Sequence, residues 1–159
     1  MRAQGREWGL GLLVLACASA AGAEGAPGPY AVSAAFGPVT FVEGSGTEAG
    51  ITVAVPAGRR WAVGVEAGYL HASPRERGAV VGLNLVRRSG GAASRVRPYW
   101  LVGLGFFNGG RNWSGSSGVT PTAGLGVQLF LNRTLFLAPE LRVGYVPMAR
   151  ATVVVGYSR

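Results

Sequence analysis

The stretch PYWLVGLGFFNGG, Pro98–Gly110, carries no charge and is rich in aliphatic and aromatic side chains. Its glycines at Gly103 and Gly105 disfavour a helix. Their two-residue spacing matches a β-strand, in which successive side chains point to opposite faces. One face would carry Trp100, Val102, Leu104 and Phe106, and the other Tyr99, Leu101, Gly103, Gly105 and Phe107. The stretch therefore predicts a strand with one bulky apolar face and one face built partly from glycine.

The same kind of unit recurs along the chain from Tyr30 onward. In each unit, about ten residues alternate between bulky apolar and small or polar side chains, and a turn follows, which is the sequence signature of a membrane β-barrel. Eight such units predict strands at residues 30–41, 49–55, 61–70, 79–87, 97–107, 119–131, 135–146 and 151–157.

The bulky face of these strands is predicted to meet lipid. A soluble sandwich or lipocalin would turn its polar face to water, but that face is poor in charge here, since charged residues make up only 14% of the chain. In lipid the sheet must close, because an open edge would leave backbone groups unpaired. The predicted fold is all-β, an eight-stranded antiparallel transmembrane β-barrel. The residues predicted to face lipid are Val63, Val65, Trp100, Val102, Leu104, Leu125, Val127 and Leu141.

The opposite face is predicted to fill a narrow lumen, because eight strands leave space for little more than side chains. Glycines are expected opposite the large inward residues, which are Tyr99, Phe107, Phe130 and Phe136. Glu66, Glu140 and Arg142 also fall on this face, at similar heights. An isolated buried charge is costly, and the planar fork of arginine can serve two carboxylates. We therefore expect Arg142 to bridge Glu140 and Glu66 and to plug the lumen, the alternative being solvated charges in a wet lumen.

The connections predict an orientation. The short connections at 56–60 and 132–133 and the longer one at 88–94 are expected on the periplasmic side. Those at 42–48, 71–78, 108–118 and 147–150 are expected outside, which places Glu48 and Arg150 in outer connections. A lower aromatic girdle is expected from Tyr30, Trp61, Trp100 and Tyr157, and an upper one from Phe41, Tyr69, Phe106 and Tyr145. Pro139 lies mid-strand and cannot donate to the ladder, so a bulge or a missing bond is expected there.

Residues 1–23 are predicted to be a cleavable signal peptide, with basic Arg2 and Arg6, the apolar segment WGLGLLVLA and small residues at 21–23. Residues 24–159 would then form the barrel domain. The alternative is lipoprotein processing at Cys17, the only cysteine. The net charge of +8 is the excess of arginines over glutamates, because the chain contains no lysine and no aspartate. Nucleic acid is not expected as a partner, because the arginines form no helical stripe and no nucleic-acid-binding motif is present.

Two segments carry a resemblance to a known family. LFLAPELRVGYV, Leu135–Val146, resembles the penultimate strand of the small outer-membrane β-barrel proteins, and RPYWLVGLG, Arg97–Gly105, resembles their Arg-Pro-Tyr strand start. The resemblance implies a monomeric barrel in the outer membrane of a Gram-negative-type bacterium, in contact with membrane lipids and lipopolysaccharide. It also implies insertion by the barrel-assembly machinery, which reads a terminal aromatic in this family; this sequence departs from that pattern, since Tyr157 lies two residues before Arg159. Many members have no assigned activity, so a structural or interaction role is expected.

The candidate catalytic residues are His71, Ser73 and Glu76. Some barrels of this type are lipid A deacylases that use a His-x-Ser pair and a glutamate, and a base beside a serine can activate it as a nucleophile. Here Pro74 follows the serine where those enzymes carry asparagine, so catalysis is not expected. A lipid A-modifying enzyme using these residues and a narrow channel are the alternatives. No metal or cofactor is expected, since one histidine and one cysteine cannot build a transition-metal site and no nucleotide motif is present.

Overall fold

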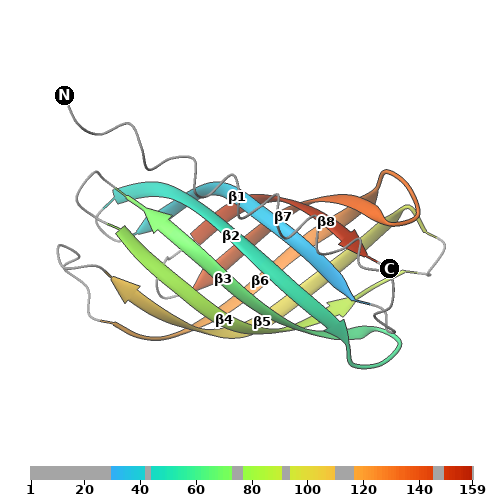
Figure 1. Ribbon diagram of the computed structural model, residues 1–159, viewed down its shortest axis with the longest axis horizontal. Coiled ribbons are helices and arrows are strands. Elements are labelled where there is room, and N and C mark those ends of the chain that lie inside the picture. Colours follow the sequence, from blue (N-terminus) through green and yellow to red (C-terminus); the bar gives the residue numbers. More distant parts are fainter. Residues whose placement is uncertain are drawn as a thin grey trace.

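The computed structural model describes residues 30–41, 44–72, 77–90, 94–109, 117–144 and 149–158. Eight β-strands follow one another around a closed antiparallel barrel in chain order (Figure 1). The strands are β1 (Ala31–Phe41), β2 (Gly44–Pro56), β3 (Trp61–His71), β4 (Arg77–Arg88), β5 (Val96–Gly109), β6 (Gly118–Phe130), β7 (Leu135–Gly144) and β8 (Ala149–Ser158). The predicted eight-stranded closed barrel is confirmed. The predicted signal peptide lies outside the described residues.

The first and last strands close the barrel. Ala31 pairs with Ser158, so β1 begins and β8 ends at the same end of the barrel, called here the terminal end (Figure 1). The β2–β3, β4–β5 and β6–β7 connections lie at this end too, because all neighbouring strands are antiparallel. Three predicted strand starts were wrong: β2 begins at Gly44 rather than residue 49, β4 at Arg77 rather than residue 79, and β8 at Ala149 rather than residue 151.

Side chains alternate between the two faces of the barrel wall. In β5, Leu104 on the outside is 59% exposed, whereas Leu101 on the inside is 2% exposed. All eight residues predicted to face lipid lie on the outer surface, where Val63 and Val127 are half-buried and the other six are exposed. Hydrophobic side chains thus cover the outside as well as part of the inside, which is the reverse of a soluble barrel's surface.

Glycines make room for the aromatic rings in the lumen. Tyr99 pairs across the ladder with Gly126, and a Cβ added to Gly126 would lie 2.5 Å from the Tyr99 ring. Phe136 pairs in the same way with Gly156, whose added Cβ would overlap the Phe136 ring. These pairs show the physical reason for glycine on the inner face: each ring occupies the space that a neighbouring side chain would take.

Pro139 interrupts the ladder without shifting it. The β6–β7 pairing runs to Gly126 opposite Glu140 and resumes at Leu129 opposite Leu137. Both strands advance by three residues across the gap, so the register is the same on its two sides. Of the two expected outcomes, the structure therefore has the missing bond and no bulge. A similar gap lies opposite Pro38 between β1 and β8, since proline has no N–H to donate.

The lumen is filled by apolar layers at two heights. Nearer the terminal end, one cluster consists of Tyr99, Leu101, Phe136, Ala138 and Val154. Nearer the opposite end, another consists of Val39, Leu70, Val80 and Phe107, with Phe41 packed against it. Phe41 therefore points into the barrel, and its predicted place in an outer aromatic girdle was wrong. It belongs to the inward set because it is an even number of residues from buried Val39 and Ala31.

Candidate functional site: an ion network in the lumen

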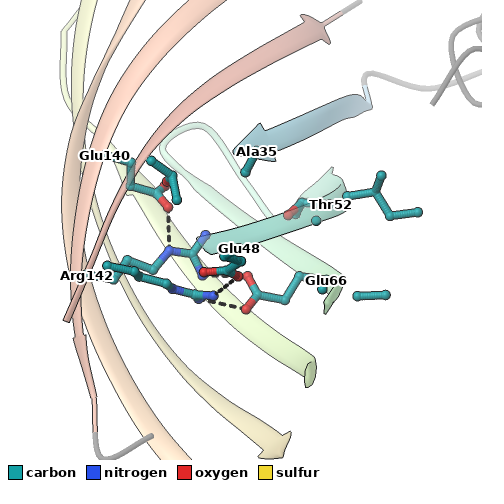
Figure 2. Close-up of a pocket in the computed structure, with 12 residues that line it drawn as sticks. Ala35, Glu48, Thr52, Glu66, Glu140 and Arg142 are labelled. Atoms are coloured by element: carbon teal, nitrogen blue, oxygen red, sulfur yellow. Dashed lines mark hydrogen bonds and ion pairs between the residues drawn. The ribbon is translucent and has the colours of Figure 1, made fainter. Parts of the chain in front are cut away.

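Arg142 on β7 lies between two carboxylates in the lumen. Its Nε donates to Glu140 on the same strand, and one terminal nitrogen donates to Glu66 on β3. In an eight-stranded barrel β3 and β7 are four strands apart, so this ion pair joins opposite walls. Figure 2 shows Glu140, Arg142, Glu66 and Glu48 converging inside the barrel. These contacts join Glu66, Glu140 and Arg142, the three residues that the alternating sequence pattern assigned to the inner face.

A second arginine extends the network beyond the residues expected from sequence. Arg150 on β8 donates to Glu66 at 2.8 Å and also to Glu48 on β2. The prediction that Glu48 and Arg150 lie in outer connections was wrong, because β2 and β8 are longer than expected. Both residues are 5% exposed, and their side chains lie in the lumen. Three carboxylates and two guanidinium groups therefore form one continuous chain of ion pairs.

Two neutral side chains complete the polar contacts. The amide nitrogen of Asn84 on β4 donates to Glu66 at 2.7 Å, and the hydroxyl of Tyr99 on β5 donates to Glu140 at 2.6 Å. Glu66 thus accepts from three different donors. Such contacts offset the large cost of removing charges from water. Within the described residues, one oxygen of Glu48 is the only carboxylate oxygen of the network that is buried without a partner.

The network lies between the two apolar layers. Along β3, Glu66 is flanked by buried Ala62 toward the terminal end and by buried Leu70 toward the opposite end. The cavity beside the ion pairs has a volume of about 10 Å³ and is lined by Glu48, Glu66 and Arg142 among others. That is about the space of a single water molecule. The middle of the barrel is therefore packed with side chains.

Local strand pattern could have revealed the two missed charges. Glu48, Gly50, Thr52 and Ala54 alternate with Ala49, Ile51, Val53 and Val55, so the small-and-polar face of β2 extends to Glu48. Arg150 continues the inner face of Thr152 and Val154 in the same manner. Both residues lie beside segments rich in turn-forming residues, which is why the sequence alone suggested loops there.

Of the three candidate catalytic residues, His71 is the one among the described residues. His71 ends β3, is half-buried and pairs across the ladders with Thr47 and Arg77. Ser73 and Glu76 lie outside the described residues. Within the described ranges there is also no group of three or more histidine, cysteine, aspartate or glutamate residues that could hold a metal ion.

The fold has counterparts among solved structures. The N-terminal β-barrel domain of Pseudomonas aeruginosa OprF aligns with a TM-score of 0.69 at 20% identity, covering 82% of this chain and 97% of that one. The fold is that of the small outer-membrane β-barrels. Neisserial surface protein A aligns with a TM-score of 0.66 at 17% identity, covering 84% of this chain and 99% of that one. A designed transmembrane β-barrel aligns with a TM-score of 0.57 at 19% identity, covering 86% and 100%.

Sequence comparison adds nothing to these structural likenesses. No protein-family model and no curated protein matches the chain. At 20% identity or less, the likeness to the solved barrels concerns the course of the backbone. The evidence for the ion network therefore comes from this chain's own residues and not from the similar barrels.

Proposed function

We propose that this protein is a monomeric outer-membrane β-barrel with a structural or interaction role, whose lumen is closed by side chains. The observation that carries the proposal is the distribution of polarity across the barrel wall. Large apolar side chains are exposed on the outside, including Leu83, Leu104 and Leu125 at 57%, 59% and 62%. The three glutamates of the described residues are all buried in the lumen. Only an apolar solvent favours such an exterior, and a closed barrel satisfies its backbone there.

The packed lumen supports a barrel that does not conduct ions. An ion would have to pass two apolar layers and displace the ion pairs between them. With the lumen filled, the parts left to act on other molecules are the outer surface and the connections at the end opposite the termini. Contacts with phospholipid and lipopolysaccharide, and insertion by the barrel-assembly machinery, follow from the same proposal.

Reconstitution tests the proposal directly. We expect the full chain to insert into phospholipid vesicles and to migrate differently in gels before and after boiling, as folded barrels do. In planar bilayers the inserted protein should give no steady single-channel conductance. Protein that stays in the aqueous phase would contradict the membrane assignment, whereas steady conductance would contradict only the closed lumen.

Catalysis is not part of the proposed function. Mass spectrometry of lipid A incubated with the inserted protein should show no loss of an acyl chain. If acyl chains are lost, His71→Ala and Ser73→Ala would show whether those residues are responsible, and the enzyme alternative would replace the proposal.

A further inference from the structure

An arginine and two tryptophans form a cluster on the outer face of the barrel near the terminal end. Trp61, Arg87 and Trp100 are in register on β3, β4 and β5. The two indole rings meet edge to face, with centroids 5.4 Å apart. The guanidinium carbon of Arg87 lies 5.6 Å from the Trp61 ring and 6.0 Å from the Trp100 ring. Cation–π attraction therefore holds an exposed arginine in one place.

The hydrogen-bond donors of Arg87 have no acceptor among the residues that the structure describes. A guanidinium group carries five N–H donors, and the contacts of Arg87 in the structure are those with the two rings. The described glutamates, Glu48, Glu66 and Glu140, are all buried in the lumen, on the other side of the wall. Arg87 is thus a fixed positive charge on the outer surface with its donors available to an external anion.

An apolar hollow begins directly beside this cluster. The next outward-facing row of paired residues on these strands is Val63, Leu85 and Val102. The outward-facing row after it contains Leu83 and Leu104. These five side chains, together with Asn84 and Gly103, line a shallow hollow of about 480 Å³ on the outer face. From the Arg87 row to the Leu83 row the distance along the strand is about 13 Å, which is about 9–11 Å along the barrel axis because barrel strands tilt by about 35–45°. The hollow therefore reaches about two thirds of the way through one leaflet's hydrocarbon layer, which is about 15 Å thick.

We propose that Trp61, Arg87 and Trp100, together with the hollow beside them, bind one anionic phospholipid of the periplasmic leaflet. The phosphate accepts hydrogen bonds from Arg87, and an acyl chain lies in the hollow between Leu83, Leu85 and Val102. Tryptophan at the membrane interface and arginine facing phosphate are the side chains that suit these two regions of a lipid. This inference rests on the proposed membrane location, since an acyl chain would have no reason to lie there in water.

Native mass spectrometry tests the inference. The full chain is folded in nanodiscs of equimolar phosphatidylglycerol and phosphatidylcholine, and the lipids that remain bound after release are counted. We expect one phosphatidylglycerol to be retained by the wild type, and its retention to fall about tenfold or more in Arg87→Gln, because charge-assisted hydrogen bonds to phosphate are strong. Arg87→Lys should lie between, since lysine keeps the charge but loses the planar fork.

A matched control separates a specific site from general attraction. Arg133 is an exposed arginine in the β6–β7 connection at the same end of the barrel, and Arg133→Gln should change retention by no more than about fivefold, the usual contribution of one charge near an anionic surface. Leu83→Trp, which fills the far part of the hollow, should lower phosphatidylglycerol retention. Inorganic phosphate should not displace the lipid, because it uses only the Arg87 part of the site.

Three results would overturn the inference: equal retention of the two lipids, equal effects of Arg87→Gln and Arg133→Gln, or displacement by inorganic phosphate. Each variant is first checked for the folded gel mobility. Protein that fails to enter nanodiscs would instead contradict the proposed function. Protein that inserts but shows no selective retention would contradict the lipid site alone.

Discussion

Arg142 and Glu66 are 76 positions apart in the sequence and form a buried ion pair across the lumen. The pair ties β7 to β3 on the opposite wall, and it is the central contact of a network that also holds Glu140, Arg150 and Glu48. Because the surrounding layers are apolar, its members have little access to water, which makes each of them sensitive to the loss of its partner.

Removing Arg142 should destabilise the barrel strongly. In Arg142→Met the carboxylates of Glu140 and Glu66 lose a buried partner, and we expect a loss of about 3–5 kcal/mol in the free energy of unfolding. Urea titration of the protein inserted in vesicles measures it. The triple variant with Glu140→Gln and Glu66→Gln should recover part of the loss, because the uncompensated charges are gone. A loss below about 1 kcal/mol for Arg142→Met would indicate a solvated network.

The hydroxyl of Tyr99 should contribute measurably on its own. Tyr99→Phe keeps the ring over Gly126 but removes the donor to Glu140, and a hydrogen bond to a charged group is worth about 1.5–3 kcal/mol. Tyr69→Phe, on the exposed outer face of β3, is the matched control, and its effect should stay within about 0.5 kcal/mol. Equal effects of the two substitutions in the same urea titration would contradict the buried hydrogen bond.

Gly156 should not tolerate a side chain. A Cβ at this position overlaps the ring of Phe136, so Gly156→Ala should cost about 1–3 kcal/mol through overpacking. Gly118→Ala is the control, because a Cβ there meets no atom within 4 Å. The difference between the two unfolding free energies is the quantity to measure. Restoring space with Phe136→Leu in the Gly156→Ala background should recover part of the loss.

A charge on the outer face should be costly at mid-height and tolerated near the rim. Leu125, in the middle of β6, is 62% exposed on the outside, and Leu131, just past the end of β6, is 59% exposed. Leu125→Arg should cost about 2–4 kcal/mol in a bilayer, whereas Leu131→Arg should cost about 0–1 kcal/mol. If both variants unfold at the same urea concentration in vesicles, the outer face does not meet hydrocarbon.

Alternation along the chain was enough to determine the fold and the facing of most side chains. The period of two is a local property of extended backbone, so Leu104 and Leu101 could be assigned to opposite faces from sequence. The same period placed Glu66, Glu140 and Arg142 on one face, and the cost of an unpaired buried charge gave the reason for them to meet.

Tertiary structure alone decided which charges complete the network and which outer residues meet. Glu48 and Arg150 enter the lumen because β2 and β8 extend past their turn-like sequences, and cross-strand pairing, a long-range interaction, sets that length. The contact of Arg87 with Trp61 and Trp100 depends on the register of three strands. Register is fixed by closure of the barrel and by the packing of its inner face, neither of which any single segment of the sequence contains.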